Sequence, residues 1–184
     1  LRRIKYCRGF GVQSPSAYRF IRYVINEHYP YYAYDELRKD LPRLDSLTRK
    51  RMELYFRIAN FRQASLWIDY CRRDDNIATY VQRGCQATRV MNICDSKHVI
   101  DNSKIEVLRI CPIDGCDTIL DVALKHVDDC TLFIIEDIGY NDTAKRLWQT
   151  LHESNLTSVS YDLYYLGIAF FDLKRFKNNY IVNF

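Results

Sequence analysis

Short apolar runs alternate with helical stretches over the last two thirds of this 184-residue chain, and this alternation most constrains its fold. Strands separated by helices of about a dozen residues are typical of parallel βαβ units, whose sheet is covered on both faces. Three further β candidates follow one another closely at the end of the chain, so the sheet should finish with antiparallel pairing. The strand-like runs cover 66–71, 88–93, 105–111, 131–135, 157–163, 167–173 and 179–184. The pattern predicts an α/β fold: a three-layer αβα sandwich with a mostly parallel sheet and terminal antiparallel strands.

The first 60 residues have a helical pattern. Ser14-Pro15 predicts a helix start, because Ser accepts hydrogen bonds from free N–H groups and Pro suits the first helical position. Tyr31-Tyr-Ala-Tyr34 follows as an aromatic-rich connection. Asp45 or Ser46 can cap a second helix whose inner side would include Phe61, and later in the chain Asn141 or Asp142 can cap the helix that follows 131–135. We therefore expect an N-terminal helical extension over 1–62 and a reduced α/β domain over 63–184.

Composition favours a globular protein. Apolar types make up 48% of the chain and charged types 27%, which excludes wholesale disorder. No apolar run approaches the roughly 20 residues that span a bilayer, and no secretory signal is visible, so we expect a soluble cytoplasmic protein without a membrane partner. The seven cysteines include no CxxC pair, which argues against a zinc site, and we interpret them as buried small apolar residues rather than disulfides.

Positive charge is concentrated in the first half of the chain. Residues 1–89 carry 18 Lys and Arg against 9 Asp and Glu, whereas residues 90–184 carry 9 against 14. A polyanion partner is one interpretation. The solvated face of amphipathic helices is the simpler one, so we expect no nucleic-acid partner.

Acidic residues follow two of the predicted strands. Asp114 comes after 105–111, and Glu136 and Asp137 come directly after 131–135. The carboxyl ends of parallel strands lie at one edge of a sheet, where open α/β folds bind ligands, and three oxygen ligands there would suit Mg²⁺. The alternative is that Asp114 and Asp137 cap the helices that follow them or stabilise the turns before those helices.

Five segments carry a further pattern: Gly9-Phe-Gly-Val-Gln-Ser-Pro15, Tyr31-Tyr-Ala-Tyr34, Ile113-Asp-Gly115, Glu136-Asp-Ile138 and Tyr161-Asp-Leu-Tyr-Tyr-Leu-Gly-Ile-Ala-Phe-Phe171. Together they resemble class I S-adenosylmethionine-dependent methyltransferases, in particular a bacterial group related to small-molecule O-methyltransferases. The resemblance covers about 1–70 and 113–184 and implies a Rossmann-like sheet.

The resemblance also implies site residues and a cofactor. It assigns S-adenosylmethionine to Asp69, Cys71 and Asp95. Asp114 and Asp137 would be catalytic toward a small-molecule acceptor, and Asp114, Glu136 and Asp137 would hold a divalent cation such as Mg²⁺.

Two departures fall on the cofactor side. The family has a glycine-rich loop after its first strand, but this chain has Asp69-Tyr-Cys-Arg-Arg-Asp-Asp75, without glycine. A Cβ there keeps the backbone away from a cofactor. Arg72 and Arg73 could hold an anion near a helix start, or pair with Asp74 and Asp75 on the surface. Only 19 positions separate Asp95 from Asp114, so one βα crossover should be missing or vestigial.

These observations leave two main functions. The first is a methyltransferase-type protein with a degenerate cofactor site, weakly active or inactive. The second is a non-catalytic module that binds a partner, in which case no cofactor is needed. Because tyrosines are dense in the N-terminal helices, we also expect a homodimer through them.

Overall fold

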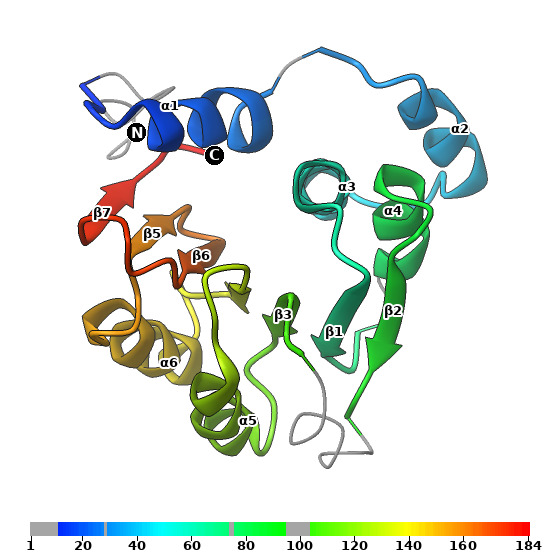
Figure 1. Cartoon of the computed structure of the whole chain (residues 1–184). Helices are drawn as coiled ribbons and strands as arrows, with labels where there is room; N and C mark the ends of the chain where they lie inside the picture. Colours follow the sequence, from blue (N-terminus) through cyan, green and yellow to red (C-terminus); the bar gives the residue numbers. More distant parts are fainter. Residues whose placement is uncertain (1–10, 28, 74–75, 95–103) are drawn as a thin grey trace.

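The computed structural model describes residues 11–27, 29–73, 76–94 and 104–184. Seven strands in these ranges form one sheet in the order β2-β1-β3-β4-β6-β5-β7 (Figure 1). Only β6 among them runs antiparallel to its neighbours. The strands are β1 (Leu66–Tyr70), β2 (Arg89–Asn92), β3 (Val107–Ile110), β4 (Leu132–Glu136), β5 (Val159–Asp162), β6 (Leu166–Phe170) and β7 (Asn178–Ile181). The prediction of a mostly parallel sheet with antiparallel pairing near the end of the chain is confirmed.

Helices cover both faces of the sheet (Figure 1). Helices α1, α3 and α4 pack in one core and α5 and α6 in the other, and neighbouring strand residues such as Trp67 and Ile68 point into opposite cores. The N-terminal helices thus provide part of one covering layer of a three-layer, Rossmann-like sandwich; the boundary at residue 62 stays a prediction. The helical segments are α1 (Pro15–Phe20), π-helical η2 (Ile21–Ile25), α2 (Ala33–Asp40), α3 (Ser46–Arg62), α4 (Ile77–Gly84), α5 (Cys116–Ala123), 3₁₀-helical η4 (Leu124–His126) and α6 (Asp142–Glu153).

Side-chain caps start three of the helices where the sequence placed them. Three side-chain oxygens accept hydrogen bonds from backbone N–H groups of the first turn: Ser14 Oγ from Ala17, Asp45 Oδ1 from Leu47 and Asn141 Oδ1 from Ala144. Each bond satisfies an N–H group that the helix itself cannot pair. The predicted helix starts are confirmed at these three positions.

Helix α2 was not predicted and begins inside the aromatic stretch that we interpreted as a connection. Its first turn carries Asp35 and Glu36 and its last turn Arg38 and Lys39. This distribution of charge complements the helix dipole, and it is a helix signal that was present in the sequence.

Two cysteines correct our interpretation of the thiols. Cys71, just after β1, forms a disulfide with Cys111, just after β3, with Cα atoms 5.0 Å apart. The two residues are far apart in the sequence, but β1 and β3 are neighbours and end at the same edge of the sheet. Sequence spacing alone does not reveal such a pairing, because it depends on strand order.

The connection from β2 to β3 is short. Its described residues, 93–94 and 104–106, contain neither helix nor strand, and residues 95–103 lie outside the described part of the chain. None of the helices in the described ranges has the length and apolar character that a bilayer-spanning segment needs.

Gly84 generates a prediction about the helical layer. A Cβ at Gly84 of α4 would lie 2.3 Å from the backbone oxygen of Phe56 in α3, so the two helices approach too closely for any side chain there. Gly84→Ala should lower the free energy of unfolding by about 1–3 kcal/mol because the helices must separate. Urea denaturation measures this, with Gln82→Ala on an exposed position of α4 as control. A loss below about 0.5 kcal/mol for Gly84→Ala would contradict the packing described here.

Candidate functional site

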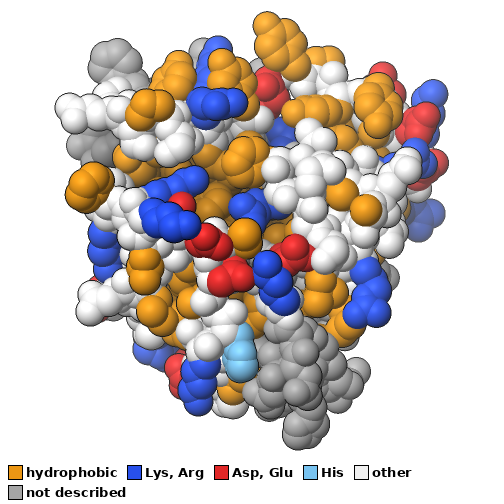
Figure 2. All heavy atoms as spheres, viewed as in Figure 1, with side chains coloured by type: hydrophobic (Ala, Val, Ile, Leu, Met, Phe, Trp, Pro, Cys, Tyr) orange, Lys and Arg blue, Asp and Glu red, His pale blue; other side chains and the backbone are white. Residues whose placement is uncertain are grey.

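The carboxyl edge of the parallel strands carries a group of charged side chains on the face that α3 covers. Figure 2 shows acidic and basic side chains lying next to one another in the middle of the face seen in Figure 1. We call the following group the edge network: Asp69, Glu136 and Asp137 with Arg51, Arg73 and Arg109.

Strand register places the centre of the edge network. Asp69 of β1 lies directly opposite Arg109 of β3. On the other side of β3, Arg109 lies opposite Ile134 of β4, and Glu136 is two residues further along that strand. Alternation along each strand turns all three side chains toward α3, on the same face as Trp67, Val107 and Ile134. Arg109 Nη1 donates to Asp69 Oδ1 at 3.2 Å and its Nε to Glu136 Oε1 at 2.9 Å.

Helix α3 closes the edge network from above. Arg51 Nη1 lies 3.2 Å from both Glu136 Oε2 and Asp137 Oδ1, and the Tyr55 hydroxyl donates to Glu136 Oε1. The guanidinium of Arg109 also lies 5.1 Å from the centre of the Tyr55 ring. Helix α3 therefore supplies a cation and a hydroxyl donor to the strand ends.

Two residues from the loops complete the edge network. Arg73, in the segment after β1, pairs with Asp137, and its Nη1 is 3.8 Å from Glu136 Oε2. The Tyr140 hydroxyl donates to Asp137 and accepts a hydrogen bond from Arg51 Nη2 at 2.5 Å. Three guanidinium groups thus face three carboxylates, and the formal charges of the six side chains cancel.

The edge network is buried except at Arg73. Asp69, Arg109 and Glu136 are at most 2% exposed, whereas the side chain of Arg73 is 42% exposed. Burial alone would raise the pKa of Asp137, but hydrogen bonds from Tyr140 and Arg73 and the charges of Arg73 and Arg51 hold that pKa below its usual value. Burial, and then the charge of Glu136, raises the pKa of Tyr55 well above its usual value, so its hydroxyl stays protonated.

The expected cofactor residues divide into three outcomes. Asp69 lies at the end of β1 as predicted, but its carboxylate is paired with Arg109. Cys71 is bonded to Cys111, so it offers no thiol. Asp95 lies outside the described residues.

The expected metal ligands do not come together. Glu136 and Asp137 are neighbours in the edge network, but Asp114 is exposed, and its backbone oxygen accepts a hydrogen bond from the Tyr70 hydroxyl at 2.6 Å. Within the described ranges, one group of three metal-ligating side chains has its ligand atoms within 4.8 Å of one another, and it consists of Asp128, Asp129 and Cys130. Since Glu136 and Asp137 already have guanidinium partners, these residues do not fit a Mg²⁺ site.

The structure also bears on the alternative roles proposed from the sequence. Asp114 and Asp137 do not cap helices with their side chains: Gly115 and Asn141 occupy the cap positions of α5 and α6. Arg73 pairs with Asp137, and its predicted surface partners at 74–75 lie outside the described part of the chain, so that pairing stays a prediction.

Sequence reasoning missed Arg109 and Arg51. Arg109 stands in the apolar run Val107-Leu-Arg-Ile110, whose four residues are all buried. A charged residue in such a strand needs an opposite charge on the same face, and this was a usable signal. Arg51 gave no comparable signal, because basic residues are common along a surface helix.

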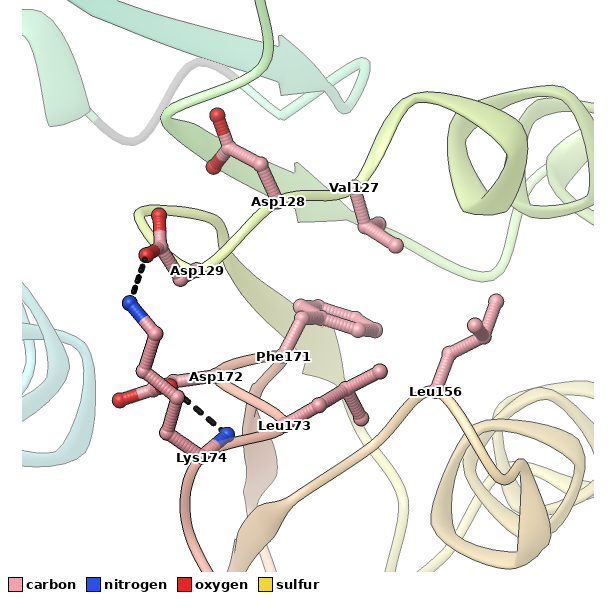
Figure 3. A pocket seen from close by; sticks show the side chains of 8 residues that line it. All are labelled: Val127, Asp128, Asp129, Leu156, Phe171, Asp172, Leu173 and Lys174. Atoms are coloured by element: carbon pink, nitrogen blue, oxygen red, sulfur yellow. Dashed lines mark hydrogen bonds and ion pairs between the residues drawn. The ribbon is translucent and has the colours of Figure 1, made fainter.

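Three cavities lie away from the edge network. A cavity of about 370 Å³ lies at the opposite edge of the sheet, where the side chains of Val127, Leu156, Phe171 and Leu173 gather around it and Lys174 pairs with Asp129 (Figure 3). The other two are about 220 Å³, beside η2 and α3, and about 260 Å³, between α1, α3 and β6.

Removing the central cation tests the edge network. Arg109→Met takes the guanidinium from between two buried carboxylates, and we expect a loss of about 3–5 kcal/mol in the free energy of unfolding. Arg83→Met is the matched control, because Arg83 makes exposed ion pairs with Glu36 and Asp40 and should cost less than about 1 kcal/mol. Equal losses for the two variants in urea denaturation would show that Arg109 does not hold the network together.

The lowered pKa of Asp137 predicts a dependence on pH. A carboxyl whose folded-state pKa lies below the unfolded value stabilises the fold above the unfolded pKa, and this contribution disappears as the pH falls through the folded pKa. Wild type should therefore lose more stability than Asp137→Asn between pH 5 and about pH 2. Urea unfolding across this range gives the two curves. Parallel curves would mean that Asp137 is not stabilised in its charged form.

Comparison with known proteins shows similarity of fold alone. The chain matches no protein-family model and no curated protein. Among solved structures it is similar to cofactor-bound Rv0187 from MTB, with a TM-score of 0.53 and 10% sequence identity, over 86% of this chain and 97% of that chain. The shared α/β architecture is the finding that this comparison supports.

Proposed function

We propose that this chain is a methyltransferase-type protein in which ion pairs have replaced the cofactor site, and that it works as a non-catalytic binding module. The observation that carries the proposal is the pairing of Asp69 and Glu136 with Arg109 at the carboxyl edge of the sheet. Open α/β proteins bind their ligands at that edge. Here protein cations already occupy the carboxylates that a ligand would use.

The loop after β1 supports the same proposal. Where the resembling family has glycines, this chain has Cys71 in a disulfide, then Arg72 and Arg73, of which Arg73 reaches across to Asp137. A nucleoside needs bare backbone at such a loop, and bulky side chains prevent that approach. Both the shape and the charge of the loop are therefore unfavourable for S-adenosylmethionine.

Energetics make a rearrangement costly. If a cofactor hydroxyl bound the Asp69 carboxylate, the buried guanidinium of Arg109 would lose one of its two acidic partners. Separating a buried ion pair costs several kcal/mol. The ligand would have to supply this energy from its own contacts. Weak or absent binding follows.

The alternative is a working methyltransferase for a small hydroxylated acceptor. The structural similarity to a cofactor-bound protein favours it. In that case Asp69 and Asp95 would contact the cofactor, and Asp114 and Asp137 would act on the acceptor, with a divalent cation if one is used. The edge network would have to open before any of these roles became available to Asp69 or Asp137.

A second copy of the chain is the partner that we propose for the binding module. Tyr18, Tyr23, Tyr29 and Tyr32 of the N-terminal layer are 41%, 56%, 82% and 85% exposed. Tyrosine is enriched at protein interfaces because it combines a large apolar ring with a hydroxyl group. A homodimer through these helices would cover the exposed rings.

Ligand-induced stabilisation distinguishes the two functions. A ligand at 100 times its Kd adds about 2.7 kcal/mol and should raise the Tm by several degrees. With S-adenosylmethionine or its demethylated product at millimolar concentration, we expect no change in Tm. An active class I methyltransferase measured in parallel verifies the ligands. A rise of several degrees for this chain would refute the non-catalytic proposal and favour the enzyme.

A further inference from the structure

The cavity between α1, the end of α3 and the β5–β6 hairpin differs from the others in its charge. Its volume is about 260 Å³, and its lining includes Arg19, Arg62 and Arg175 together with aromatic side chains. None of the described residues that line it is acidic. We call it the arginine cavity.

The three guanidinium groups are only partly used. Arg19 is exposed and has no hydrogen bond or ion pair with any described residue. Arg62 donates from Nη2 to the backbone oxygen of Cys130, but its Nε is buried without a hydrogen-bond partner. Arg175 Nε lies 3.2 Å from Asp172 Oδ2, so one acid compensates one of the three cations. The cavity therefore keeps a surplus of positive charge.

The aromatic part of the lining includes one accessible ring. Phe61 was expected on the inner side of its helix, but it is 52% exposed, with its ring centre 5.3 Å from that of Phe20. Phe20 in turn packs on Tyr161 and Phe170, which are buried. The half-exposed ring of Phe61, supported by buried aromatic side chains, offers a stacking surface beside the arginines.

Charge and shape together select the ligand. Two or three guanidinium groups suit a phosphate, which carries more than one negative charge and has several acceptor oxygens for their planar N–H pairs. The exposed ring suits a flat group attached to that phosphate. We propose that the arginine cavity binds a nucleotide, with the phosphate at Arg19, Arg62 and Arg175 and the base against Phe61.

This site is separate from the edge network and does not depend on the proposed function. Phe170 pairs with Leu132 and Val159 at the amino ends of β4 and β5, and Arg62 contacts the residue two before β4, so the cavity lies toward the opposite edge of the sheet. The nucleotide could be free or part of a single RNA strand, since both present a phosphate next to a base.

Isothermal titration calorimetry with GMP, guanosine, inorganic phosphate and a single-stranded RNA hexamer tests the proposal on the full chain. We expect GMP to bind at least about tenfold more tightly than guanosine or phosphate, because only GMP uses both parts of the site. A hexamer that binds far more tightly than GMP, with a steep dependence on salt, would identify an RNA strand as the source; similar affinities would identify the free nucleotide.

Variants locate the binding. Arg19→Gln and Phe61→Leu should each weaken GMP binding about tenfold or more, and both positions are exposed enough to leave the fold intact, which circular dichroism verifies. Arg43→Gln is the matched control: it removes one exposed arginine before the opposite end of α3 and should change nothing.

Three results would overturn the proposal. The first is no heat of binding for GMP or RNA at millimolar concentration. The second is binding that neither Arg19→Gln nor Phe61→Leu weakens. The third is an acidic peptide that binds as tightly as GMP and with the same sensitivity to Arg19→Gln, which would identify the cavity as a general anion site.

Discussion

A buried arginine between two buried carboxylates is the constraint on which this structure depends. Arg109 is 1% exposed and contacts Asp69 on one neighbouring strand and Glu136 at the end of the other. A charge in that position is tolerated only with its partners in place, so it ties the register of β1, β3 and β4 to the position of α3. Loss of any one partner would leave a buried charge uncompensated, which is strongly destabilising.

The two edges of the sheet consequently differ in what they can bind. At the carboxyl edge, Asp69, Glu136 and Asp137 are matched by three arginines, and a disulfide joins the loops after β1 and β3. Toward the amino edge, the arginine cavity has more positive charge than its acids compensate. The chain therefore combines an α/β architecture with a carboxyl edge whose described acids and arginines pair with one another.

Much of the fold could be predicted from local sequence patterns. Alternating apolar runs gave the strands, and Ser14, Asp45 and Asn141 gave helix starts, because these signals depend on neighbouring residues alone. The site could be predicted only in part. Asp69, Glu136 and Asp137 were placed at strand ends, but their partners depend on strand order and on which helix covers them. The Cys71–Cys111 bond and the contact between Arg73 and Asp137 are long-range pairings of this kind.

The most direct test of the central claim is a crystal structure of the protein grown with millimolar S-adenosylhomocysteine. We predict that Arg109 keeps its contacts with Asp69 and Glu136, that Arg73 stays on Asp137, and that no nucleoside density lies against the carboxyl ends of β1 and β3. Density for an adenosyl group at that edge, with Asp69 released from Arg109, would contradict the account.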